Sequence, residues 1–219
     1  EARAPADRSF QYRVHNRPGF EPAVVTSADG TTHVYTWELK DLPPIEVEPG
    51  MPSMREVRSW LEVSSISAWQ EIASWFWSLA KPQVTADAAV RATVSRVAAG
   101  LKTDEEKARA LYDWVANRVR YVGLEFGLSA FRPHAAPEVH ENLYGDCKDK
   151  SSLLVAMLGR VGIKAHLVLL QSGQYRAVKD ELPSLGAFNH CISLAEVGGR
   201  EVWLDPTAED CAYGDIPPE

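Results

Sequence analysis

The sequence predicts an α+β fold, in which helices pack on an antiparallel sheet and a short β region precedes them. Two observations predict the main domain: a helix that begins at Cys147, and an antiparallel hairpin between residues 188 and 205. A third observation is the series of strand signals near the N-terminus, separated by turn residues. We therefore expect a β region over residues 1–64 and a domain that carries the chemistry over residues 65–219.

The N-terminal region contains three strand-like segments, which are residues 10–14, 32–39 and 57–63. Asp29-Gly30 predicts a tight turn before the second segment. The proline-rich stretch over residues 42–52 interrupts the sheet, because proline lacks the N–H that a strand ladder needs. Three strands make a poor independent domain.

Three helices are expected to follow, because apolar residues recur at helical spacing between recognisable start and stop signals. The start signals are Ser67 with Gln70 at the capping-box position, Thr85, and Thr103 with Glu106. The first helix carries Trp69, Trp75 and Trp77. At this spacing we interpret the tryptophans as packing residues, with a sugar-binding platform as the alternative.

The next helix places Cys147 in its first turn. Asp146 is the expected N-cap, and Gly162 is the expected stop. Its apolar stripe is Leu154, Met157, Leu158 and Val161. Because the unpaired amides of a helix N-terminus stabilise negative charge, this position favours a thiolate. The charged residues 148–150 are expected on solvated helix surface, with Asp149 able to bond back to the cap.

The hairpin supplies the groups that a cysteine nucleophile needs. A turn at Gly198-Gly199 brings His190 and Asp205 to within one or two residues of direct opposition, where they are close enough to hydrogen-bond. A histidine can take the proton of the thiol, and an aspartate can orient the histidine. The order cysteine, histidine, aspartate therefore predicts a catalytic triad.

These residues lie in motifs that resemble the bacterial transglutaminase-like superfamily. The motifs are Tyr-Gly-Asp-Cys-Lys-Asp at 144–149, Gly-Ile-Lys-Ala at 162–165, Phe-Asn-His at 188–190 and Trp-Leu-Asp-Pro-Thr at 203–207. The resemblance covers roughly residues 85–210 and implies a papain-like core. It implies that Cys147 is the nucleophile, His190 the general base and acid, and Asp205 the group that holds the imidazole tautomer.

The resemblance also implies an oxyanion site formed by the backbone N–H of the cysteine and a side-chain donor from the region before it. Tyr121 is the first candidate for that donor and Tyr144 the second. Unlike eukaryotic transglutaminases, this chain has no tryptophan between Trp114 and Cys147, which speaks against protein cross-linking.

The implied activity is cysteine acyl transfer on peptide or amide carbonyls through a thioester, with hydrolysis, deamidation or transamidation as the outcome. The alternative is a catalytically silent module that binds peptide or glycan within a larger exported protein. Residues 1–64 resemble the C-terminal remnant of a β-sandwich domain of unknown function that is often fused upstream of such domains. The resemblance also implies an exported or periplasmic location.

The composition and charge of the chain argue against some classes of binding partner. A formal charge of −7 and a pI near 5.4 argue against nucleic acid, and no apolar run is long enough to span a membrane. The chain begins with Glu1, so we expect a processed or excised piece. Three cysteines are too few for a disulfide framework, although a Cys191–Cys211 bridge is conceivable. We expect Cys191 to point into the core, and we expect no cofactor and no structural zinc at His134 or His140. The sequence does not indicate an oligomeric state.

Overall fold

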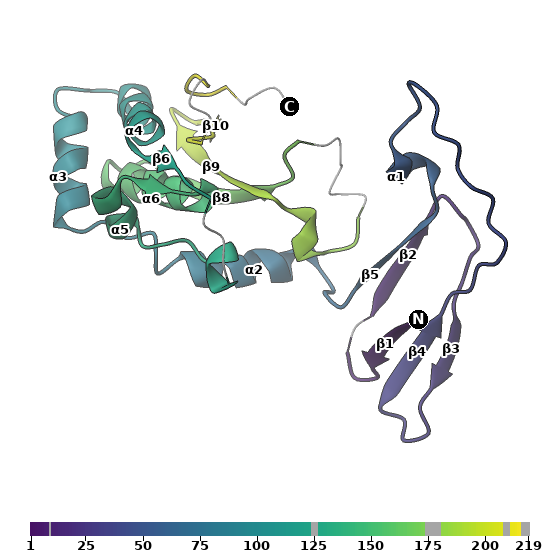
Figure 1. The fold of residues 1–219 in the computed structure, drawn as a ribbon. Helices are drawn as coiled ribbons and strands as arrows, with labels where there is room; N and C mark the ends of the chain where they lie inside the picture. Colours follow the sequence, from purple (N-terminus) through teal and green to yellow (C-terminus); the bar gives the residue numbers. More distant parts are fainter. Residues whose placement is uncertain (9, 124–126, 174–180, 208–210, 216–219) are drawn as a thin grey trace. The chain divides into compact units, whose positions relative to one another are not determined.

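The computed structural model describes residues 1–8, 10–123, 127–173, 181–207 and 211–215. The chain divides into two compact units, which are residues 1–72 with 177–185, and residues 73–176 with 186–219 (Figure 1). No helix among the described residues is long and apolar enough to cross a membrane.

The N-terminal unit consists of short antiparallel strands. Its strands are β1 (Ala2–Pro5), β2 (Gln11–His15), β3 (Ala23–Thr26), β4 (Thr32–Thr36) and β5 (Trp60–Ser64), and its helix is α1 (Met54–Val57). One sheet has the order β1-β4-β3, and β2 pairs with β5. The three predicted strand segments overlap β2, β4 and β5, whereas β1, β3 and α1 were not predicted. That this unit is the remnant of a β-sandwich domain stays a prediction.

The predicted turn at Asp29-Gly30 lies between β3 and β4. The Asp29 carboxylate accepts the N–H of Thr31 at 3.0 Å and the hydroxyl of Ser27 at 2.5 Å. Gly30 has a φ of +74°, which glycine adopts at little cost. The turn therefore sets the register in which Val25 lies opposite Val34.

Three helices follow, as the sequence predicts: α2 (Trp69–Ala80), α3 (Ala88–Val97) and α4 (Asp104–Arg118). The capping box of Thr103 and Glu106 is confirmed at the start of α4. The expected start signal of α3 at Thr85 is wrong, because the N-cap is Asp87, whose carboxylate accepts the N–H of Val90, and the helix begins at Ala88.

The first of these helices differs from expectation in its cap and its buried face. Ser67 bonds the carboxylate of Glu71 rather than Gln70. The buried residues of the helix are Ile72, Phe76 and Ala80. Trp77 is 44% exposed, and Trp75 is 38% exposed with its ring edge-on to Phe131, so the packing interpretation does not hold for Trp77.

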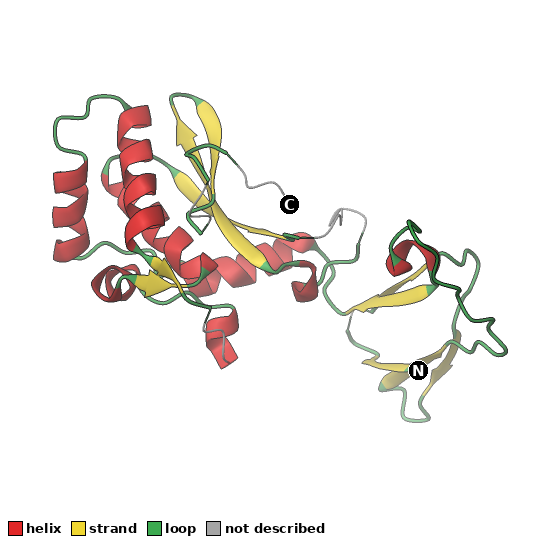
Figure 2. Cartoon of the chain, turned by 45° about the horizontal axis from the view of Figure 1, so that its top comes forward, coloured by secondary structure: helices red, strands yellow, loops and turns green. Residues whose placement is uncertain are grey.

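The C-terminal unit is a mixed α+β domain, which confirms the predicted fold class (Figure 2). It also contains β6 (Arg120–Tyr121), η1 (Gly127–Ala130), α5 (Ala136–Asn142), β7 (Tyr144–Gly145), α6 (Cys147–Arg160), β8 (Ala165–Leu170), β9 (His190–Val197) and β10 (Arg200–Leu204), and η3 (Leu185–Ala187) precedes β9. The antiparallel sheet has the order β10-β9-β8, and β6 pairs in parallel with β7.

Helix α6 is the centre of this unit. It packs against β8 and β9 on one side and against α4 and α5 on the other (Figure 1). All residues from Cys147 to Leu158 are buried. The core around α6 includes Leu111, Tyr112, Val115, Leu154 and Met157. A helix that is covered on every side positions its first residue from several elements at once.

Candidate active site

Cys147 is the first residue of α6, at a capped N-terminus. The Asp146 carboxylate accepts the N–H of Asp149 at 3.1 Å, and the Asp149 carboxylate accepts the N–H of Asp146 at 3.2 Å. This reciprocal pair confirms the predicted N-cap and the back-bond from Asp149. The N–H of Cys147 makes no hydrogen bond to a described residue. The cysteine is 5% exposed.

Two serine contacts fix α6 on strand β9. Ser151 donates its hydroxyl to the carbonyl of Cys191 at 3.0 Å, and Ser193 donates to the carbonyl of Ser151 at 3.3 Å. Cys147 lies one helical turn before Ser151 and packs in the same buried cluster as Cys191. The structure therefore confirms that Cys191 points into the core. Cys191 and Cys211 are both free thiols, so the conceivable bridge between them is not formed.

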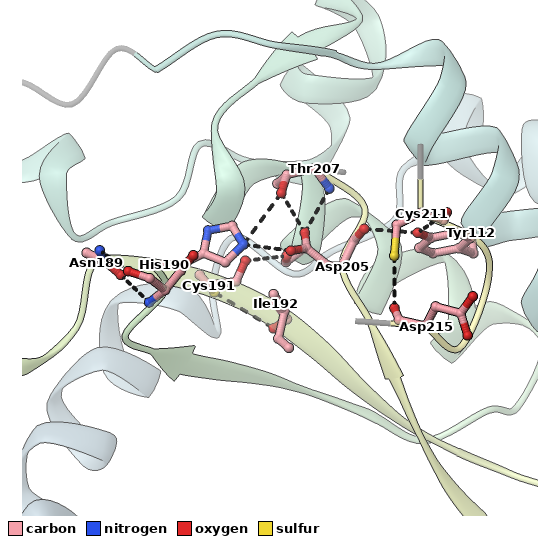
Figure 3. Close-up of polar contacts among 11 residues, drawn as sticks. Tyr112, Asn189, His190, Cys191, Ile192, Asp205, Thr207, Cys211 and Asp215 are labelled. Atoms are coloured by element: carbon pink, nitrogen blue, oxygen red, sulfur yellow. Dashed lines mark hydrogen bonds and ion pairs between the residues drawn. The ribbon is translucent and has the colours of Figure 1, made fainter. Parts of the chain in front are cut away.

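His190 and Asp205 come together through the predicted hairpin. Strand β10 pairs with β9 so that Leu204 lies opposite Ser193, which leaves Asp205 close to His190. The Nε2 atom of His190 lies 2.8 Å from Oδ2 of Asp205 (Figure 3). Thr207 donates its N–H and its hydroxyl to Oδ1 of Asp205, at 3.0 and 2.5 Å. The carboxylate is thus held between histidine and threonine.

The electrostatics of this pair favour a charged histidine. Burial lowers the pKa of His190, but its interactions with Asp205 and Cys147 outweigh burial and raise the pKa to about 9. Burial raises the pKa of Asp205, but the bonds from His190 and Thr207 bring it below its usual value. Because Nε2 is bonded to Asp205, Nδ1 is the ring nitrogen left for the thiol. The site can therefore hold an imidazolium beside Cys147 at neutral pH.

The thiol of Cys191, the other cysteine of this buried cluster, ionises less readily than an ordinary thiol. Burial raises the pKa of Cys191 well above its ordinary value, and nearby Cys147 raises it further. A buried thiol of this kind is a poor nucleophile, because the thiolate is the reactive form. The two cysteines thus pack side by side in one cluster but have different surroundings.

The two tyrosine candidates lie on neighbouring strands beside the start of α6. Tyr121 ends β6 and lies opposite Gly145 of β7, and Tyr144 lies opposite Arg120. Tyr121 and Tyr144 are 45% and 43% exposed. Tyr144 also lines a cavity of about 220 Å³ with Asp149. The role of either tyrosine as an oxyanion donor stays a prediction.

The expectation that residues 148–150 form solvated surface is wrong. Lys148 is 4%, Asp149 2% and Lys150 0% exposed. Each makes a polar contact: the ammonium of Lys148 bonds the carboxylate of Asp146, and that of Lys150 donates to the carbonyl of Ala116 at 3.2 Å. Because α6 is covered on every side, a charged first turn is buried here, and partners offset the cost of its burial.

Sequence reasoning missed two residues of this site. Thr207 lies in the Trp-Leu-Asp-Pro-Thr motif, and a hydroxyl two residues after a carboxylate is a recognisable signal for a local bond. His134 is the second of these residues. Its N–H and its Nδ1 lie 2.7 and 3.0 Å from the two carboxylate oxygens of Asp149. No local pattern predicts that contact, because it depends on how α5 packs beside α6.

Part of the chain matches a known protein family. Residues 91–197 match the family model of the Transglutaminase-like superfamily. The chain is similar in structure to a putative protease from Parabacteroides distasonis ATCC 8503, with a TM-score of 0.70 and 18% identity. That match covers 92% of this chain but 38% of the protease, so the chain spans well under half of it.

Two weaker structural matches were also found. A putative cysteine protease from Cytophaga hutchinsonii has a TM-score of 0.43 and 14% identity over 95% of this chain and 67% of that one. A structure titled as a TGase has a TM-score of 0.40 and 13% identity, over 72% of this chain and 41% of that one. No curated protein sequence matches the chain significantly.

Proposed function

Because residues 91–197 of this chain form a transglutaminase-like domain, we propose that the protein is a cysteine acyl-transfer enzyme that acts on peptide or amide carbonyls. The observation that carries this proposal is the arrangement around His190. Its imidazole bonds Asp205 at 2.8 Å and also interacts with Cys147 at a helix N-terminus. Thiol, imidazole and carboxylate in this order are the equipment for nucleophilic catalysis.

In the proposed reaction the thiolate of Cys147 attacks the carbonyl carbon of an amide. The carbonyl π electrons move to its oxygen, and a tetrahedral oxyanion forms. When this intermediate collapses, the C–N bond breaks, and imidazolium His190 gives its proton to the departing amine. A thioester on Cys147 remains.

Water or an amine then resolves the thioester. Neutral His190 takes a proton from the attacking nucleophile, the C–S bond breaks, and the thiolate is restored. Asp205 keeps its negative charge throughout and stabilises the imidazolium, which is present at the start of the first half and forms again in the second. Its bonds from Thr207 hold the carboxylate in place for that purpose.

A thioester on Cys147 is the species that tests this proposal. The protein is mixed with an activated aryl ester or a peptide library, quenched in acid, digested and analysed by mass spectrometry. We expect an acyl group on the Cys147 peptide that hydroxylamine removes. Cys147→Ala should carry none, and Cys211→Ala, which alters a cysteine outside the buried cluster, should behave as the wild type. A wild-type protein that is never acylated contradicts the proposal.

The low exposure of Cys147 favours a second candidate function. A thiol that is 5% exposed meets a substrate carbonyl only along a narrow approach, and a silent module that binds peptide or glycan has no need of one. An electrophile distinguishes the two functions. Fast and selective alkylation of Cys147 near neutral pH supports the enzyme, whereas an unreactive Cys147 supports the binding module.

We propose, from the resemblance, that the full protein is exported or periplasmic. Fractionation of cells that express the full protein tests this location, and recovery with the cytoplasmic fraction would contradict it.

A further inference from the structure

The carboxylate of Asp149 interacts with three donor groups near the first turn of α6. It accepts the N–H of Asp146 at 3.2 Å, the N–H of His134 at 2.7 Å and a contact from Nδ1 of His134 at 3.0 Å. The residue is 2% exposed, so its carboxylate is buried among these groups. A carboxylate held by several donors is a rigid point of attachment.

Gly145 leaves room for this attachment. A Cβ added to Gly145 would lie 2.6 Å from Cβ of Asp149, which is closer than such atoms approach in proteins. Any side chain at position 145 would therefore displace Asp149. The absence of a Cβ at this position is a steric requirement of the contact, separate from the hydrogen bonds themselves.

The segment that Asp149 holds in place carries the backbone N–H of Cys147. Asp149 fixes the N–H of Asp146, and the Asp146 carboxylate fixes the N–H of Asp149 in return. The N–H of Cys147 lies between these two attachments and makes no bond to a described residue. It is one of the unpaired donors that a helix N-terminus presents.

This placement matters for the reaction proposed above. Attack by Cys147 creates an oxyanion next to its own backbone, and a preorganised N–H stabilises that charge only if it stays in position. The carboxylate of Asp149 is occupied by its three donors. It can act on the reaction only through the peptide that it holds.

We propose that Asp149 and His134 are positioning residues, which hold the Cys147 N–H as the donor to the oxyanion. This inference rests on the proposed acyl-transfer function. His134 keeps Asp149 in place through its backbone N–H and its ring, and Asp149 keeps the peptide at residues 145–147 in place. Neither side chain contacts the substrate.

Two reactions of the same thiol test this role. Iodoacetamide alkylates Cys147 without forming an oxyanion, whereas an activated aryl ester acylates it through one. A loss of oxyanion stabilisation lowers acylation by about 10- to 1000-fold and leaves alkylation nearly unchanged. A general loss of structure slows both reactions together.

Three variants disturb the attachment by different routes. Asp149→Asn replaces an oxygen acceptor by an amide donor that faces the N–H of His134 or Asp146. Gly145→Ala displaces Asp149 sterically and keeps every polar group. His134→Gln removes the ring contact and retains the backbone bond, so it should have the mildest effect. Ser152→Ala is the control, because Ser152 is buried in α6 and its hydroxyl has no partner among the described residues.

We expect Asp149→Asn and Gly145→Ala to lower the acylation kcat at least tenfold, with alkylation within about threefold of the wild type. Ser152→Ala should leave both rates unchanged.

The inference is overturned if acylation stays at the wild-type rate in all three variants, or if both reactions fall in parallel in variants that retain the wild-type circular dichroism and Tm. If Asp149→Asn does not fold, His134→Gln and Gly145→Ala decide by the same criterion. A wild-type protein that is alkylated but never acylated refutes the proposed function itself, and this inference with it.

Discussion

Replacing Asp205 by Asn removes the charge that stabilises imidazolium His190 and retains the shape of the side chain. The amide oxygen of Asn can still accept the bonds from Thr207, so the fold of the hairpin should survive. What changes is the electrostatic partner of Nε2, which lies 2.8 Å from Oδ2 in the wild type. The variant therefore isolates the contribution of one negative charge.

The site as a whole raises the pKa of His190 from 6.5 to about 9 in the folded protein, and Asp205 supplies part of that rise. Each tenfold change in proton affinity corresponds to about 1.4 kcal/mol, so the site stabilises the imidazolium by about 3 kcal/mol. Water screens the pair little, because the side chains of His190 and Asp205 are 17% and 7% exposed. Asp205 raises the pKa more than Cys147 does, and burial opposes both.

We therefore expect Asp205→Asn to lower the pKa of His190 more than Cys147→Ala does. Titration of the histidine side chains by NMR measures this, with His190→Gln identifying the signal among the six histidines. Turnover should fall by up to about 10⁴-fold in Asp205→Asn, by analogy with serine triads. The reasoning is refuted if His190 titrates in Asp205→Asn as it does in the wild type, or if Cys147→Ala lowers its pKa more.

Three further predictions concern the same residues. Cys147→Ala should abolish turnover and leave the urea midpoint of unfolding nearly unchanged, and full activity of this variant would show that another group is the nucleophile. In iodoacetamide labelling followed by mass spectrometry, Cys147 should react before Cys191, whose thiol is buried and has a raised pKa. His190→Ala should slow the reaction of Cys147 at pH 6. A faster reaction of Cys191 than of Cys147 would contradict this order. The loss of folding stability in Asp205→Asn should be greatest from about pH 4 to 6.5. It should shrink as the pH rises through about 9, because His190, whose pKa is raised, then loses its proton in the folded protein too. It should also shrink in acid, because Asp205, whose pKa is lowered, is then protonated. Urea unfolding at a series of pH values measures that loss, and a loss independent of pH would contradict it.

The features that the sequence predicted correctly are those set by local chemistry. Asp146 caps α6 because an aspartate before a helical run can accept its free amides, and the turn at Gly198-Gly199 sets the register that brings His190 to Asp205. Both depend on residues within about twenty positions of one another. The cap of α6 and the contact between His190 and Asp205 could therefore be predicted before the fold was known.

The features that the sequence failed to predict depend on what packs against each element. Lys148 and Lys150 are charged residues of a type that usually lies on the protein surface. Both are buried here, because α4, α5 and the sheet enclose α6. His134 reaches Asp149 from a segment that periodicity does not connect to α6. The tryptophan-rich helix α2 buries Phe76 and leaves Trp77 exposed, since the identity of the covering partners decides which face is buried.

The burial of a charged first turn bears on how the nucleophile is held. An unpaired ion in a protein interior is strongly destabilising, and a buried charge that loses its partner costs several kcal/mol. Here Asp146 bonds Lys148, Asp149 bonds His134, and Lys150 bonds a carbonyl at the end of α4. Each of these contacts has a direction, unlike apolar packing, so a shift of the helix start would break several of them together. The charges around Cys147 therefore favour a single position of its backbone, which a fixed oxyanion donor requires.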